Sequence, residues 1–151
     1  MSENPISFED VMNYAISREQ EAHKFYMDLA QKVKNPHLKK EVEIFAAEEK
    51  MHKAKLDNIK ARKIVIEPGK IEKLGIADWT VEVEPAEDMD YEDLLILAMK
   101  REKEAFDFYN TTASMMEDKE LKKLFLMLAR EEANHKLRFE SEYDRVILKE
   151  D

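Results

Sequence analysis

Residues 45–56 read FAAEEKMHKAKL, and residues 128–139 read LAREEANHKLRF. Each segment contains a Glu that is followed three residues later by a His. The segments lie 83 positions apart, and the same offset aligns AISREQEAHKFYMDLA (15–30) with AMKREKEAFDFYNTTA (98–113) without a gap. Because both blocks share one offset, we interpret the chain as one helical hairpin that occurs twice.

Glycine and proline, the residues that interrupt helices, occur only before residue 6, at Pro36 and between residues 68 and 85. The stretches between them are rich in Ala, Leu, Glu, Lys and Met, which favour helices. Ser7 and Asp90 each precede an acidic residue by three positions, as helix N-caps do. The sequence therefore predicts four helices, over residues 7–34, 37–61, 90–117 and 119–149.

The connections between these helices predict the topology. The first and third joints are short, whereas residues 62–89 contain β-branched residues, Pro and Gly and are expected to form an extended crossover with a short strand. Two antiparallel hairpins joined by a long crossover form a known four-helix-bundle topology. We expect an all-α, ferritin-like four-helix bundle that forms a single domain over residues 1–151.

Each predicted helix has a seam of largely apolar residues at spacings of three and four, and a Glu interrupts each seam near its middle. In chain order the four seams are Met12, Ala15, Glu19, Ala22, Tyr26, Leu29 and Val33; Leu38, Val42, Phe45, Glu49, His52, Leu56 and Ile59; Leu95, Ala98, Glu102, Ala105, Tyr109, Thr112 and Met116; and Leu121, Phe125, Leu128, Glu132, His135, Phe139 and Glu142. Two of the helices add a His one turn later. Several buried carboxylates must protonate, admit water or bind cations, because an uncompensated buried charge costs several kcal/mol or more. Two divalent ions would balance four carboxylates, and carboxylate with imidazole suits iron, manganese or zinc. The alternative is a structural bundle in which buried polar groups fix the helix register. The inward residues are Glu19, Glu49, His52, Glu102, Glu132 and His135.

The segments SREQEAHKFY, EEKMH, KREKEAFDFY and EEANH give the chain a resemblance to a known family. It resembles the rubrerythrin branch of the ferritin-like superfamily of non-haem di-iron proteins. The resemblance implies two iron ions per chain, for which manganese or zinc can substitute, with the six inward residues as ligands and Glu49 and Glu132 as bridging carboxylates. It also implies that Tyr26 and Tyr109 form hydrogen bonds to the ligands, with plain core packing as the alternative.

The sequence departs from the family pattern in two respects. Full-length rubrerythrins carry a rubredoxin domain with a four-cysteine iron site, and this chain has no cysteine, so a separate electron donor such as a rubredoxin is expected. Family members also carry an extra Glu, linked to peroxide chemistry, where this chain has Ala105.

One asymmetry between the two repeats is His23, whose counterpart is Phe106. His23 is interpreted as an extra ligand, a proton shuttle or a histidine on the flank of the helix.

The resemblance implies an oxidoreductase that reduces peroxide or dioxygen. A ferroxidase or iron-handling protein would use the same ligands, and a bundle that binds a partner without metal is the third alternative.

The net charge of −9 argues against nucleic-acid binding, and no apolar run reaches the roughly 18 residues of a membrane span, so a cytoplasmic protein is expected. A homodimer is also expected, because apolar crossover residues need a surface to cover, unless they cap their own bundle or help protomers to exchange hairpins. These residues are Ile64, Val65, Ile66, Trp79, Val81 and Val83.

Overall fold

The computed structural model describes residues 7–61 and 89–150. Each of the four predicted helices is present, with ends within two residues of the predicted ones. The helices are α1 (Phe8–Lys32), α2 (Pro36–Lys60), α4 (Tyr91–Met115) and α5 (Lys119–Glu150). The predicted crossover strand and the six apolar crossover residues lie outside the described residues.

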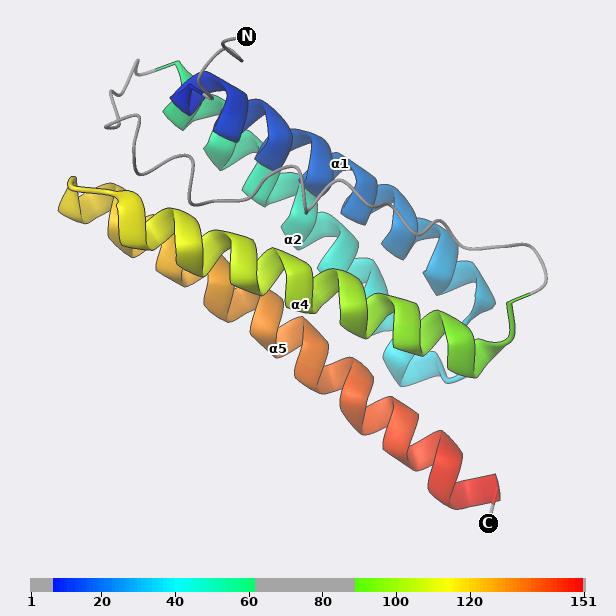
Figure 1. The fold of residues 1–151 in the computed structure, drawn as a ribbon. Helices are drawn as coiled ribbons and strands as arrows, with labels where there is room; N and C mark the ends of the chain where they lie inside the picture. Colours follow the sequence, from blue (N-terminus) through cyan, green and yellow to red (C-terminus); the bar gives the residue numbers. More distant parts are fainter. Residues whose placement is uncertain (1–6, 62–88, 151) are drawn as a thin grey trace, which may run out of the picture. The chain divides into compact units, whose positions relative to one another are not determined.

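The helices pack in pairs that are adjacent in sequence. The chain divides into two compact units, Met1–Ile76 and Ala77–Asp151. In the first unit α1 packs antiparallel to α2, and in the second α4 packs antiparallel to α5 (Figure 1). We call these units hairpin 1 and hairpin 2. With 32 residues against 25, α5 runs past the first residue of α4 (Figure 1).

The helix caps repeat between the hairpins, as the helices do. Ser7 and Asp10 form a reciprocal capping box at α1, with hydrogen bonds of 3.0 and 3.1 Å, and the counterpart Asp90 accepts a 2.8 Å bond from the Asp93 amide at α4. The predicted N-caps are thereby confirmed. The second helix of each hairpin begins after Asn35 or Asp118, whose side chains also accept from amides of the first turn. Such a cap stabilises a helix by about 1 kcal/mol.

The predicted seams form the buried face of every helix. On α5 all seven seam positions are buried, from Leu121 to Glu142. Only Ala22, Phe45 and Ala105 among the seam residues of the other helices are half-buried instead. Burial of a large apolar side chain contributes roughly 1.5–3 kcal/mol, so the apolar residues of the seams stabilise the hairpins. The polar residues of the same seams lie among them.

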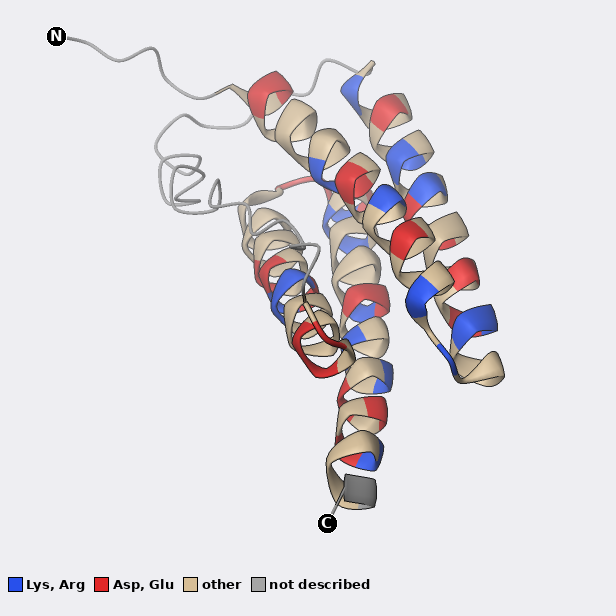
Figure 2. Cartoon of the chain, turned by 90° about the vertical axis from the view of Figure 1, so that its right-hand side faces the viewer, with Lys and Arg blue, Asp and Glu red and all other residues tan. Residues whose placement is uncertain are grey.

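Charged residues cover the other faces of the helices. Each helix carries both Lys or Arg and Asp or Glu, so the charges are not segregated by sign (Figure 2). Pairs four residues apart, such as Lys53 with Asp57 and Lys103 with Asp107, are partly or fully exposed and add a few tenths of a kcal/mol each. Among the described helices, none combines the length and apolar character that crossing a membrane requires.

Candidate functional site

Hairpin 1 brings three of the predicted ligands together. Glu49 and His52 lie one turn apart on α2, so their side chains share a face, and α1 supplies Glu19. Nδ1 of His52 lies 3.5 Å from Oε2 of Glu19 and 3.9 Å from Oε2 of Glu49. One potential ligand atom from each residue falls within 4.8 Å of the others, and all three side chains are buried.

Hairpin 2 repeats this arrangement with nearly the same distances. Nδ1 of His135 lies 3.6 Å from Oε1 of Glu102 and 3.8 Å from Oε1 of Glu132. These three side chains are also buried, and their ligand atoms again fall within 4.8 Å of one another. The sequence repeat is therefore preserved in the side-chain geometry, and both sets are built from one Glu of the first helix and a Glu-x-x-His of the second.

The donor set of each hairpin fits a transition-metal ion. Two carboxylates balance the charge of one divalent cation, and an imidazole adds a ligand without adding charge. Carboxylate and imidazole together suit iron, manganese or zinc rather than calcium, which takes oxygen ligands. Burial supports the same interpretation, because buried carboxylates require compensating charge. Each hairpin thus carries a buried set of side chains that could hold a metal ion.

Comparison with known proteins supplies the family. The rubrerythrin family model matches residues 10–143, which is most of the chain. The chain belongs to the rubrerythrin family. A solved structure of a hypothetical protein from Pyrococcus furiosus is 29% identical, with a TM-score of 0.71 over 92% of this chain and 89% of that one. No curated protein matches the sequence significantly. The predicted family and the ferritin-like four-helix-bundle fold class are both confirmed.

Both tyrosines that the resemblance assigned to the ligands are buried. The Tyr26 ring contacts the edges of Phe25 and Phe45, with centroids 5.6 and 6.1 Å apart. The Tyr109 ring stacks on Phe125 at 6.2 Å. Buried aromatic pairs of this kind contribute about 0.5–1.5 kcal/mol beyond their buried area. Packing against neighbouring rings is therefore one role that both tyrosines have.

His23 of hairpin 1 lies outside the two sets of side chains that could hold a metal ion. Its Nδ1 atom is 2.7 Å from the carbonyl oxygen of Ala46 on α2. A carbonyl only accepts hydrogen bonds, so Nδ1 carries the hydrogen and the ring is held across the hairpin. Neither group of metal-ligating side chains among the described residues includes His23. This position agrees with the interpretation of His23 as a residue on the flank of α1.

A second polar cluster, formed around the buried Glu142 in hairpin 2, was not anticipated. Tyr91 donates a 2.9 Å hydrogen bond to Glu142, and Arg145 donates two bonds of 2.8 Å to the same carboxylate. The hydrogen bonds from Arg145 have the largest effect and lower the pKa of Glu142, and the bond from Tyr91 lowers it further. Burial and the Glu142 carboxylate raise the pKa of Tyr91. A comparison of the two repeats could have revealed this cluster, because the polar residues Tyr91 and Glu142 align with the apolar residues Phe8 and Ile59 of hairpin 1.

Proposed function

We propose that this protein is a non-haem di-iron oxidoreductase that reduces peroxide or dioxygen. The observation that carries the proposal is the pair of matching, buried Glu, Glu and His sets in a chain of the rubrerythrin family. A purely structural role would not require the same three donors, at nearly the same distances, in both hairpins.

The six side chains together would hold two iron ions, with manganese or zinc as substitutes of similar preference. Glu49 and Glu132 are the proposed bridging carboxylates. The bound metals would supply two electrons to the O–O bond of the oxidant. The protein contributes the position of the ligands and an apolar surrounding, in which Tyr26, Tyr109 and neighbouring side chains exclude water.

Metal content and single-turnover kinetics test this function. Protein from iron-supplemented cells should contain two iron ions per chain, and the Glu132→Gln variant should contain fewer. Anaerobically reduced protein should then be reoxidised by hydrogen peroxide faster than free ferrous iron is. Reoxidation at the rate of free iron, with the metal bound, would refute the oxidoreductase proposal.

Iron handling is the second candidate, because ferrous oxidation for storage or transfer uses the same donor set. The two candidates differ in what happens after many turnovers. An oxidoreductase keeps two irons per chain, whereas a storage protein accumulates ferric iron inside a shell of many subunits. Size-exclusion chromatography with iron analysis separates these outcomes. A bundle that binds a partner without metal predicts no bound metal in either measurement.

The partners follow from the proposed reaction. The chain has no cysteine with which to hold a rubredoxin-type iron, so we propose a separate donor protein such as a rubredoxin. We also propose a homodimer in the cytoplasm. Mixing reduced rubredoxin with the iron-loaded protein and peroxide should oxidise the rubredoxin catalytically, and protein without iron serves as the control.

A further inference from the structure

The outer face of α5 carries three exposed leucines, Leu126, Leu137 and Leu148, which we call the leucine stripe. They are 44%, 61% and 71% exposed. Successive members are eleven residues apart, which is close to three turns of a helix, so all three lie on one face. Two residues are separated by about 200° around a helix, so Leu137 lies opposite its buried seam neighbours His135 and Phe139. The packing of hairpin 2 therefore leaves the leucine stripe uncovered.

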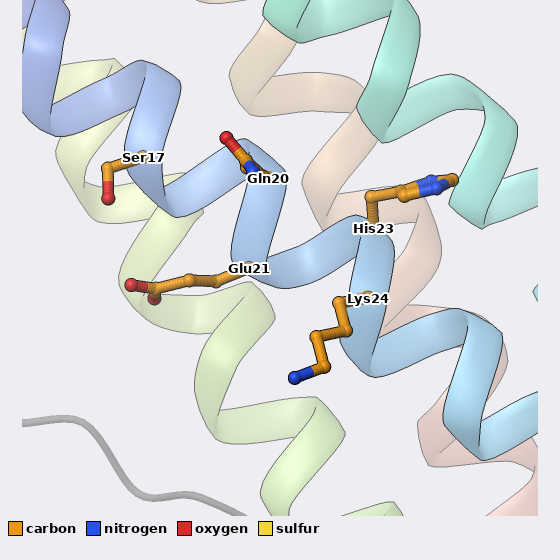
Figure 3. Close-up of a pocket in the computed structure, with 5 residues that line it drawn as sticks. All are labelled: Ser17, Gln20, Glu21, His23 and Lys24. Carbon is orange, nitrogen blue, oxygen red and sulfur yellow. The ribbon is translucent and has the colours of Figure 1, made fainter.

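Neither the hairpin fold nor the buried Glu and His set requires this stripe. In the sequence repeat, hairpin 1 has Glu43 where hairpin 2 has Leu126, and Ala54 where it has Leu137. The surface of hairpin 1 also includes a hollow of about 430 Å³ along α1, whose lining is polar or charged (Figure 3). Exposed apolar side chains that gather on one face mark interaction sites. The leucine stripe is thus a feature of hairpin 2 that calls for a partner.

The leucine stripe is symmetrical about Leu137, because Leu126 and Leu148 lie eleven residues before and after it. In an antiparallel pair of α5 helices with Leu137 on the two-fold axis, Leu137 would meet its own copy and Leu126 would meet the partner's Leu148. Arg130 and Asp144 are exposed and lie seven residues, nearly two turns, on either side of Leu137. The same pairing would bring them opposite each other twice per dimer. The stripe therefore complements a second copy of itself.

The charges of α5 favour the antiparallel direction. Residues 119–130 contain four Lys or Arg and one Glu, whereas residues 139–150 contain two Lys or Arg and four Asp or Glu. Antiparallel pairing places the basic end of one helix against the acidic end of its copy, and parallel pairing would place like charges together. Over its whole length α5 has eight basic and seven acidic residues, in a chain with a net charge of −9. Two copies therefore meet with less repulsion along α5 than along the rest of the chain.

We propose that the leucine stripe is a dimer interface, in which two copies of this chain pair their α5 helices antiparallel about Leu137. It rests on the proposed homodimer, for which it supplies the surface, and is independent of the proposed oxidoreductase chemistry. Leu148 lies six residues beyond Glu142, to which the first residue of α4 is hydrogen-bonded, so the end of α5 that passes α4 would lie against the partner (Figure 1). A single helix pair is smaller than the interface of an obligate dimer, so we expect a dimer that dissociates on dilution.

Sedimentation equilibrium of the metal-loaded protein tests the surface. Leu137→Glu places two like charges at the symmetry axis and should raise the dimer dissociation constant at least tenfold. Ile44→Glu is the matched control, because Ile44 is 55% exposed on α2, and it should leave the constant unchanged. Both positions are exposed, so both variants should fold and keep their metal, which circular dichroism and metal analysis can verify.

Charge reversal tests the register. Arg130→Asp and Asp144→Arg should each weaken the dimer, because each places like charges opposite one another, and the double variant should restore the wild-type dissociation constant. The chain has no cysteine, so Leu137→Cys introduces the only thiol. Mild oxidation should link this variant to its own copy, because position 137 lies on the axis, and Met51→Cys, at an equally exposed position of α2, should stay unlinked.

Two results would overturn the proposal. A wild-type protein that stays monomeric up to about 1 mM would refute the interface together with the homodimer. A dimer that Leu137→Glu leaves unchanged would refute this interface alone, and would assign the dimer to the crossover residues or to exchanged hairpins. Neither result bears on peroxide reduction, which the reoxidation kinetics test separately.

Discussion

Tyr91, at the start of α4, donates a 2.9 Å hydrogen bond to Glu142, near the end of α5. The two residues are 51 positions apart, and the carboxylate between Tyr91 and Arg145 is buried. In hairpin 1 the equivalent positions hold Phe8 and Ile59, which are also buried. The same place in the fold is therefore filled by an apolar pair in one copy and by a hydrogen-bonded polar cluster in the other.

Replacing Glu142 with Gln should destabilise the protein by about 1–2 kcal/mol at pH 7, because the charged hydrogen bonds to Arg145 are lost. Those bonds lower the folded pKa of Glu142, so its contribution to stability is full above the ordinary carboxyl pKa and disappears as the pH falls through the folded value. Urea unfolding between pH 3 and pH 7 should show the wild type and the variant converging in acid. A difference in unfolding free energy between the two proteins that stayed constant from pH 7 to pH 3 would contradict this role of Glu142.

Tyr91 predicts the opposite pH dependence. Burial and the Glu142 carboxylate raise its pKa, so its contribution is full below the ordinary value near 10 and is lost as the pH rises through the folded value. Tyr91→Phe should therefore lose less stability than the wild type above about pH 10. Unfolding curves and the absorbance of tyrosinate near 295 nm, recorded together on both proteins, would test this prediction.

The double variant Tyr91→Phe with Glu142→Ile gives hairpin 2 the residues of hairpin 1. Each single change leaves a buried polar group without its usual partner, whereas the double change removes both, so it should be less destabilising than the sum of the single changes. A double-mutant cycle measured by urea unfolding should give a coupling energy of about 1 kcal/mol or more. Additive single effects would mean that the two residues do not act together.

Glu49→Gln should have opposite effects with and without metal. In the metal-free protein the change removes a buried charge and should be neutral or stabilising. In the metal-loaded protein it should abolish the stabilisation from binding, which is about 2.7 kcal/mol when free metal exceeds Kd a hundredfold. Thermal unfolding with and without a chelator measures both effects, and the absence of any chelator effect on the wild type would argue against a metal site.

Glu19→Gln and Glu102→Gln should lower the metal content to the same extent, because the two residues stand 3.5 and 3.6 Å from equivalent histidine nitrogens. Metal analysis of both variants, purified side by side, measures this directly. Glu104→Gln, an exposed neighbour on the same helix, is the control and should retain all of its metal. Loss confined to one of the two variants would mean that the hairpins bind metal independently and unequally.

The sequence alone predicted the helices and the inward position of the six Glu and His side chains, because both follow from local patterns. Gly and Pro mark the connections, Ser7 and Asp90 cap their helices through neighbours three residues away, and Glu49 with His52 share a seam by helical spacing alone. The proximity of Glu19 to His52 was also expected, since each residue interrupts an apolar seam that must face its partner.

Relationships between helices were harder to predict. Glu142 was placed on a seam, but its partner Tyr91 lies 51 residues away and only the packing of α4 on α5 reveals the hydrogen bond. His23 similarly needed the position of the Ala46 carbonyl before its ring could be oriented.

The hydrogen bond from His23 to Ala46 ties α1 to α2 one helical turn along α1 from Glu19, whereas hairpin 2 has Phe106 at the position of His23. A duplicated protein that keeps its ligands in both copies can change their surroundings in one copy at a time. Equivalent positions of the two hairpins can therefore be compared within one molecule. The two hairpins differ at His23 and Phe106 and at Ile59 and Glu142, while the distances among their buried Glu and His side chains are nearly the same.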